Sequence, residues 1–244
     1  MPDRYKLGAL APRRPYGLST LAVYAKGRLP APPASTAIPA VSQWGMMDND
    51  RLGCCTISGV GHAILAWNAE VHESDKVPTD AQVQSTYFAL TGGADAGCVE
   101  ADVLQTWRTH GLFGHRIAAY APVETHDLVG LQQAVAFYGA AYLGVALPES
   151  AQEQFAKGQA WTVDPNSPIE GGHCILAVGY DHEYVQCVTW GGVVNVSYPW
   201  LATYCTEIWA IISNEFVEAG KGPLLDLATL QADLNSISTR KAQA

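Results

Sequence analysis

Charged side chains are scarce in this chain, and basic side chains are the scarcest. Asp, Glu, Lys and Arg make up 15% of the 244 residues, and 23 acidic residues outnumber 14 basic ones, so the net charge is −9. A nucleic-acid partner would require a basic face. We therefore expect no nucleic-acid partner.

Long hydrophobic runs are also missing. No stretch approaches the roughly 18 consecutive apolar residues of a transmembrane helix, so no membrane association is expected. The basic residues near the N-terminus are not followed by the apolar segment of a secretory signal. The sequence thus favours a cytoplasmic location.

Cysteines are too few and too irregularly spaced for a disulfide scaffold. The six are Cys54, Cys55, Cys98, Cys174, Cys187 and Cys205. No Cys-x-x-Cys pair is present, so a structural zinc site is not expected, and nothing in the sequence indicates a metal or a cofactor.

What the chain does have is apolar material for a core, at 48% of its residues, arranged in four regions. Residues 1–43 hold seven of the fourteen prolines and are predicted to form an extended arm rather than helix. Helical patterns dominate residues 44–114, and short Val-, Ile- and Tyr-rich runs typical of strands dominate 115–214. Residues 215–244 are a tail with a surface helix. Segregated helices and strands predict an α+β fold with two subdomains.

Within these regions the individual elements can be placed. The spacing of apolar residues predicts a helix from about Cys55 to Glu73, and a second that begins near Pro78 with Thr79 or Asp80 as N-cap. A third ends at Gly111. One further helix, at about residues 128–139, interrupts the strands.

Cys55 and His173 are the candidate catalytic residues. Cys55 follows Gly53 at the predicted start of a helix, and a helix N-terminus lowers the pKa of a thiol. His173 follows two glycines and opens an apolar strand. Taken singly, a buried structural cysteine and a histidine with structural hydrogen bonds are the commoner interpretations.

Two segments carry a resemblance to a known family. DNDRLGCCTISG is similar to a Gln-Gly-x-Cys-Gly-Ser-Cys-Trp motif, with Asn49 at the glutamine, Gly53 at the glycine and Cys55 at the nucleophile. GGHCILAVGYD is similar to Gly-x-His-Ala-x-x-x-Val-Gly-Tyr, with His173 at the histidine. The chain resembles the papain-like cysteine peptidases, in the order of its motifs, over about residues 44–214.

The resemblance implies a papain-like architecture, with a helical left subdomain, an antiparallel, β-barrel-like right subdomain and the active-site cleft between them. Cys55 would attack a carbonyl, His173 would protonate the leaving amine, and the Cys55 N–H and the Asn49 amide would form the oxyanion hole. The family has a further residue that orients the histidine. A count of sixteen residues from His173 places Thr189 at this position, and we favour Thr189. Alignment on the Trp190-Gly191 pair places Val188 there instead.

Three interpretations of Cys54 remain open. Neighbouring cysteines rarely bond each other, because the ring is strained. Cys54 is therefore a bystander, a redox partner of Cys98, or the nucleophile in a shifted register.

The resemblance predicts a cysteine peptidase or related amide hydrolase that acts on a peptide or protein. Transfer of an acyl group to an amine would use the same residues. Because several family positions are substituted, a non-catalytic structural or interaction protein is the alternative. The substituted motifs, NDRLGCCT and VTWGG, resemble those of proteins from bacteriophages and actinobacteria. The alternative therefore includes a virion component, which would bind partner proteins through the N-terminal arm and the C-terminal helix. The arm looks too short and too poor in helix for the family's usual inhibitory pro-segment.

Overall fold

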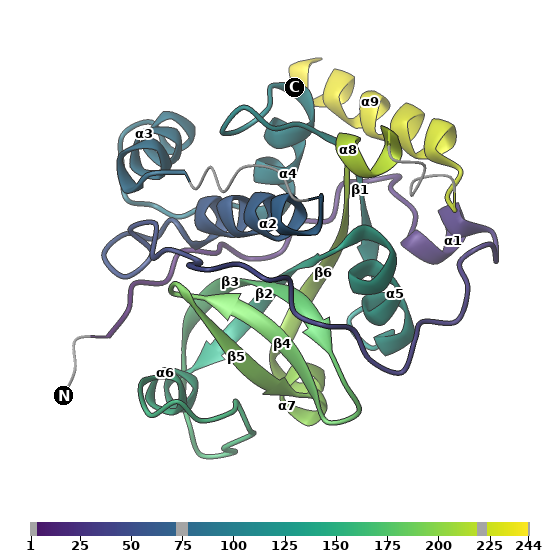
Figure 1. Cartoon of the computed structure of the whole chain (residues 1–244). Helices are drawn as coiled ribbons and strands as arrows, with labels where there is room; N and C mark the ends of the chain where they lie inside the picture. The colour runs from purple at the N-terminus through teal and green to yellow at the C-terminus, as the bar shows by residue number, and fades with distance from the viewer. Residues whose placement is uncertain (1–3, 72–77, 219–223, 244) are drawn as a thin grey trace.

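The computed structural model describes residues 4–71, 78–218 and 224–243, and it contains helices on both faces of one sheet (Figure 1). The helices are α1 (Leu21–Ala25), α2 (Cys55–Val71), α3 (Asp80–Thr91), α4 (Glu100–Thr109), α5 (Leu128–Tyr138), α6 (Glu149–Ala156), α7 (Tyr198–Tyr204), α8 (Asn214–Glu218) and α9 (Leu227–Gln243). The strands are β1 (Ile117–Val123), β2 (Ala141–Pro148), β3 (Ile169–Tyr180), β4 (Tyr184–Thr189), β5 (Gly192–Ser197) and β6 (Cys205–Ser213).

The six strands form one antiparallel sheet in the order β1-β6-β2-β3-β4-β5. β2 lies at its centre, where Gly144 pairs with Cys174 of β3 on one side and with Glu207 of β6 on the other. Residues directly opposite each other in neighbouring strands share a face of the sheet. These three residues therefore form one row across the sheet.

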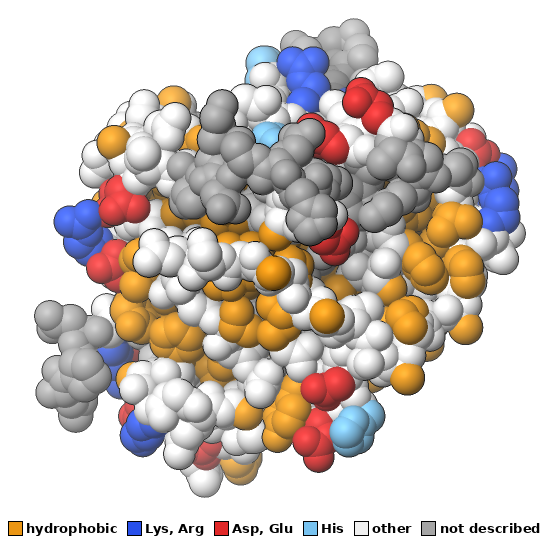
Figure 2. Space-filling model, viewed as in Figure 1, with side chains coloured by type: hydrophobic (Ala, Val, Ile, Leu, Met, Phe, Trp, Pro, Cys, Tyr) orange, Lys and Arg blue, Asp and Glu red, His pale blue; other side chains and the backbone are white. Residues whose placement is uncertain are grey.

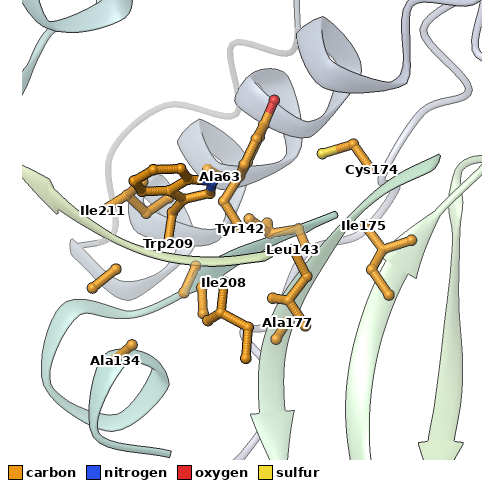
Figure 3. Close-up of a cluster of buried hydrophobic side chains, with 14 of the residues drawn as sticks. Ala63, Ala134, Tyr142, Leu143, Cys174, Ile175, Ala177, Ile208, Trp209 and Ile211 are labelled. Carbon is orange, nitrogen blue, oxygen red and sulfur yellow. The ribbon is translucent and has the colours of Figure 1, made fainter. Parts of the chain in front are cut away.

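Side chains of β2 alternate between two cores. Tyr142 points towards α2, where Ala63 lies, and Leu143 points towards α5, where Ala134 lies (Figure 3). All four residues are fully buried. Because successive side chains of a strand face opposite sides of the sheet, α2 and α5 cover opposite faces. The combination of helices with an antiparallel sheet that the sequence predicts is therefore confirmed.

Local chemistry explains why the predicted helices begin where they do. The Thr79 hydroxyl accepts from the backbone N–H of Gln82, and the Gln82 side chain accepts from the Thr79 N–H, so α3 starts with a capping box. Asp127 caps α5 in the same manner by accepting from the Gly130 N–H at 2.9 Å. The predicted end of the first long helix, Glu73, lies outside the described residues.

Several short elements were not predicted. β5, α6 and α7 add to the strand-rich region, and α1 interrupts the arm, which was expected to be free of helix. In the tail, α9 packs against β1 and α1. Its Leu230 and Leu234 are fully buried, whereas other residues of the helix are exposed.

The basic side chains are scattered over the surface. On the face shown in Figure 2, the described Lys and Arg side chains lie near the periphery and do not form one patch. None of the helices in the described ranges is both long and apolar enough to cross a lipid bilayer. All six cysteines are free.

Candidate active site

Cys55 is the first residue of α2, and its position is fixed from two sides. The preceding Gly53 donates its N–H to the Asp95 carboxylate at 2.9 Å. On the other side, the Tyr142 hydroxyl donates to the carbonyl oxygen of Thr56 in the first turn of the helix. The N-terminus of α2 is thus tied both to the helical region and to the central strand β2.

The Cys55 thiol is completely buried. Burial raises its pKa to about 12, and the backbones of Cys174 and Gly8 act in the opposite direction. A thiol with such a pKa is neutral at pH 7. The helix N-terminus favours a thiolate, but burial outweighs that effect here.

Cys54 occupies a different environment from its neighbour. Its sulfur donates to the carbonyl oxygen of Met47 at 3.5 Å and lies 3.6 Å from the Ser58 hydroxyl. Burial raises the pKa of Cys54 to about 12 as well. The two adjacent thiols therefore have separate hydrogen-bonding neighbours.

His173 lies on β3, one residue before Cys174, and contacts the residue expected to orient it. Its Nε2 is 2.7 Å from the Thr189 hydroxyl. The imidazole also stacks on Trp190, with 4.6 Å between ring centroids and 22° between planes. With the Nε2 proton donated to Thr189, Nδ1 presents a lone pair, and this buried Nδ1 has no hydrogen-bond partner among the described residues.

The imidazole is neutral in this state. Burial, with a smaller contribution from the nearby His62, lowers the pKa of His173 to about 3. His62 lies beneath the site on α2, buried, with Nε2 3.0 Å from the Gly45 carbonyl oxygen. That position agrees with a structural role for His62 rather than a catalytic one.

Asn49 lies in the turn that leads into α2. The two residues before it, Met47 and Asp48, have positive φ values of 54° and 57°, so this turn holds two non-glycine residues in the left-handed region. Asn49 is 1% exposed, and its Oδ1 has no hydrogen-bond partner among the described residues. Among the described residues, no hydrogen bond joins the Asn49 amide to Cys55, so its place in an oxyanion hole stays a prediction.

The N-terminal arm passes between the helical region and the sheet, directly over Cys55. On the helical side, the Lys6 N–H donates to the Asp50 carbonyl at 3.0 Å. On the sheet side, the Ala9 N–H donates to the Gly172 carbonyl at 3.0 Å. The Gly8 backbone, between them, acts on the Cys55 thiol. This segment therefore occupies the cleft.

The backbone of Cys98 also forms hydrogen bonds with the arm, beside the Cys55 thiol. Its N–H donates to the Gly8 carbonyl at 2.9 Å, and its carbonyl accepts from the Leu10 N–H at 2.9 Å. Ala9 and Cys98 thus form a parallel bridge. Tyr5 anchors the start of the segment by stacking on Trp190, with 4.7 Å between centroids.

Glycines make this close approach possible. A Cβ atom at Gly8 would lie 1.9 Å from the Gly53 carbonyl oxygen, and one at Gly172 would lie 2.2 Å from the Ala9 carbonyl oxygen. At Gly97 it would lie 2.4 Å from the Gly8 carbonyl oxygen. The sequence analysis did not identify these contacts, although glycines beside both predicted catalytic residues are a signal of close backbone approach.

Similarity to solved structures defines the fold. No protein-family model matches the chain, and no curated protein matches it in sequence. Xylellain, a cysteine protease from Xylella fastidiosa, superposes with a TM-score of 0.67 at 16% identity, over 87% of this chain and 98% of that one. The Carica candamarcensis cysteine protease CMS1MS2, solved in complex with E-64, gives 0.51 at 12% identity, over 75% of this chain and 99% of that one. Digestive procathepsin L 3 of Tenebrio molitor larval midgut gives 0.52 at 13% identity, over 86% and 76%. The chain has the fold of the papain-like cysteine peptidases.

Proposed function

We propose that this chain is a cysteine peptidase, or a related amide hydrolase, held in a closed state by its own N-terminal arm. The observation that supports it is the environment of His173. Its Nε2 lies 2.7 Å from the Thr189 hydroxyl and its ring stacks on Trp190, while the backbone of the next residue, Cys174, contacts Cys55. The strand that carries His173 thus approaches the Cys55 thiol, and a thiol with an imidazole as its base is the pair that acyl transfer needs.

In the proposed reaction, Nδ1 of His173 takes the proton of the Cys55 thiol. The thiolate attacks the carbonyl carbon of a peptide or protein substrate, and a tetrahedral oxyanion forms. The Cys55 N–H and the Asn49 amide would stabilise this oxyanion. The imidazolium then protonates the leaving amine, a thioester remains on Cys55, and water hydrolyses it to release the acid and restore the thiol.

The closed state cannot carry out this reaction. Both Cys55 and His173 are fully buried, and their pKa values of about 12 and about 3 keep both neutral. Burial is the main cause of both shifts, and the arm is part of what buries the thiol. Departure of the arm would let water reach both groups and would bring their pKa values closer together.

Alkylation of Cys55 tests the proposal. Iodoacetamide or an epoxide probe at pH 6 should label Cys55 of an arm-released protein faster than a free thiol, and His173→Ala should abolish that excess. Cys55→Ser should lose the label and Cys54→Ser should keep it. If Cys55 reacts no faster than a free thiol, or if His173→Ala labels equally fast, the proposal is wrong.

The occupied cleft also favours a second candidate, a non-catalytic papain-fold protein. Such a protein would use the fold as a structural or interaction module, in the cytoplasm or as a bacteriophage virion component, with the arm permanently in place. Its thiol would stay unreactive even after displacement of the arm. The same alkylation experiment therefore separates the two candidates.

A further inference from the structure

A strained stretch of backbone carries Asn49 to the start of α2. In the segment from Gly45 to Asn49, which we call the Asn49 segment, Met47 and Asp48 hold left-handed φ values of 54° and 57°. Residues other than glycine adopt this conformation at a cost in free energy, and it persists only where surrounding contacts hold it. The contacts between this segment and the rest of the chain therefore decide where the Asn49 side chain lies.

Three polar side chains on one side of α2 contact the Asn49 segment. Cys54, immediately before the helix, is followed at intervals of four residues by Ser58 and His62, so the three lie on one side of the helix, and all are buried. The Ser58 hydroxyl lies 3.1 Å from the Met47 carbonyl oxygen, and the Cys54 sulfur lies 3.5 Å from the same oxygen. His62 contacts the Gly45 carbonyl oxygen through Nε2 at 3.0 Å. We call these three side chains the α2 polar row.

Each member of the α2 polar row has a proton to donate at neutral pH. Burial raises the pKa of Cys54 to about 12, so the thiol keeps its proton. Burial lowers the pKa of His62 to about 4, so the imidazole is neutral, and Nε2 carries the proton because a carbonyl oxygen only accepts. The Ser58 hydroxyl has one proton, and the Cys54 carbonyl oxygen also lies within its reach at 3.2 Å. The row thus supplies donors to two buried carbonyl groups of the segment, which would be costly to leave without partners.

The helix also leaves room for the side chain of Met47. A Cβ atom at Gly61 of α2 would lie 2.5 Å from Sδ of Met47 and 3.0 Å from its Cε. Met47 is 1% exposed, so its thioether packs on the helix where the side chain of residue 61 is absent. The helix therefore holds Met47 by its backbone carbonyl and by its side chain.

At its other end the Asn49 segment meets the turn between β4 and β5. Gly45 forms an antiparallel bridge with Gly191, and a Cβ atom at Gly191 would lie 3.1 Å from the Gly45 carbonyl oxygen. Gly191 follows Trp190, which stacks on His173. The segment thus connects the surroundings of the imidazole with the N-terminus of α2.

We propose that Cys54, Ser58 and His62 are positioning residues that hold the Asn49 side chain in place for the proposed reaction. The inference rests on the proposed function, because the Asn49 amide stabilises an oxyanion only in an enzyme. The Asn49 Oδ1 has no hydrogen-bond partner among the described residues, so its direction depends on the backbone that carries it. The proposal also gives Cys54 a role, as a donor to the segment rather than as a nucleophile or a redox partner of Cys98.

Hydrogen exchange of the full-length chain tests these contacts without any need for catalysis. Ser58→Ala removes one donor, and the amide hydrogens of residues 46–52 should then exchange about fivefold faster, whereas those of α5 keep the wild-type rate. Cys54→Ala should act in the same direction. Cys205→Ala is its matched control, because the Cys205 thiol also donates to a carbonyl at 3.5 Å, that of Glu207, and it should leave residues 46–52 unchanged. Wild-type exchange in both Ser58→Ala and Cys54→Ala would overturn the proposal.

Kinetics then separate the positioning of Asn49 from general support of the fold. In a full-length Gly8→Ala background, whose arm is expected to leave the cleft, Ser58→Ala should lower kcat for a peptide about tenfold with KM unchanged within a factor of two. Cys54→Ser keeps a donor and should retain most of the kcat that Cys54→Ala loses. When Asn49→Ala is also present, Ser58→Ala should have no further effect, because the amide that it positions is gone. An equal loss of kcat with and without Asn49 would show a merely structural role, and the proposal would be wrong.

Failure of this inference and failure of the proposed function give different results. If Cys55 is reactive and peptides are cleaved, but Ser58→Ala leaves kcat unchanged, the enzyme exists and the α2 polar row does not position Asn49. If Cys55 of the Gly8→Ala chain reacts no faster than a free thiol, the proposed function fails and the positioning role falls with it. Faster exchange of residues 46–52 in Ser58→Ala would then identify the row as a support of the fold alone.

Discussion

Replacement of Gly8 by alanine is expected to expel the arm from the cleft and to expose Cys55. An added Cβ atom would lie 1.9 Å from the Gly53 carbonyl oxygen, whereas real Cβ contacts shorter than 3.0 Å essentially do not occur. The two backbones would have to separate by about 1 Å. Hydrogen bonds near 3.0 Å do not survive such a displacement.

The magnitude follows from the contacts that hold the segment. Four backbone hydrogen bonds join residues 6–10 to the cleft walls, with lengths between 2.9 and 3.0 Å. Each contributes about 1 kcal/mol net, and loss of two to four of them destabilises the closed state by about 2–4 kcal/mol. Because each 1.4 kcal/mol corresponds to a factor of about ten, the open fraction should rise roughly thirty- to a thousand-fold.

The assay is the rate at which iodoacetamide modifies Cys55 at pH 7, followed by mass spectrometry of the Cys55 peptide. Gly27→Ala is the matched control, because Gly27 lies in the same arm and an added Cβ there meets nothing within 4 Å. Gly27 has a left-handed backbone with a φ of 72°. Alanine at this position is therefore locally strained, but it causes no clash in the cleft. We expect rapid labelling in Gly8→Ala and wild-type labelling in Gly27→Ala. A folded Gly8→Ala protein that labels at the wild-type rate would show that the arm does not protect the thiol.

Three further changes probe the site. Thr189→Val removes the hydroxyl that holds His173 and should lower the kcat of the arm-released enzyme about tenfold or more, with Thr189→Ser retaining most of it in the same peptide assay. Asn49→Ala should lower kcat about a hundred- to a thousand-fold with little change in KM, if its amide stabilises the oxyanion; an unchanged kcat would remove Asn49 from the oxyanion hole. Glu207→Gln should stabilise the fold at pH 8, as measured by chemical denaturation. The pKa of Glu207 is raised to about 7 in the fold, so its stabilising protonated form is lost as pH rises through that value. The gain should be on the order of 1–3 kcal/mol, and should disappear below the ordinary carboxyl pKa of 4.5.

Features set by neighbouring residues could be predicted from the sequence. The start of α2 at Cys55 follows Gly53, and the start of α3 uses the Thr79 side chain as its cap. The count of sixteen residues from His173 to Thr189 identified two side chains that lie 2.7 Å apart. Their catalytic roles stay predictions, since a hydrogen bond does not by itself establish a reaction.

Features that depend on distant backbone contacts could not be predicted. The course of the arm is set by the fit of Gly8 against Gly53, and its sequence shows only prolines and small residues. The position of Glu207 opposite Gly144 depends on the register of β6 against β2, which no local pattern reveals. A short helix such as α1 was missed because five residues with no side-chain cap give little periodicity.

Adjacent residues of β3 point in opposite directions. His173 contacts Thr189 and Trp190, whereas Cys174 faces Glu100 and lies opposite Gly144, as the alternation of side chains along a strand requires. The backbone of Gly8 in the arm acts on the Cys55 thiol from the other side. In the proposed enzyme the arm and a substrate would therefore compete for the place beside Cys55, while His173 determines whether the thiol reacts. Substitutions at Gly8 should change how much of the protein is accessible to substrate, and substitutions at His173 should reduce cleavage of all peptides equally.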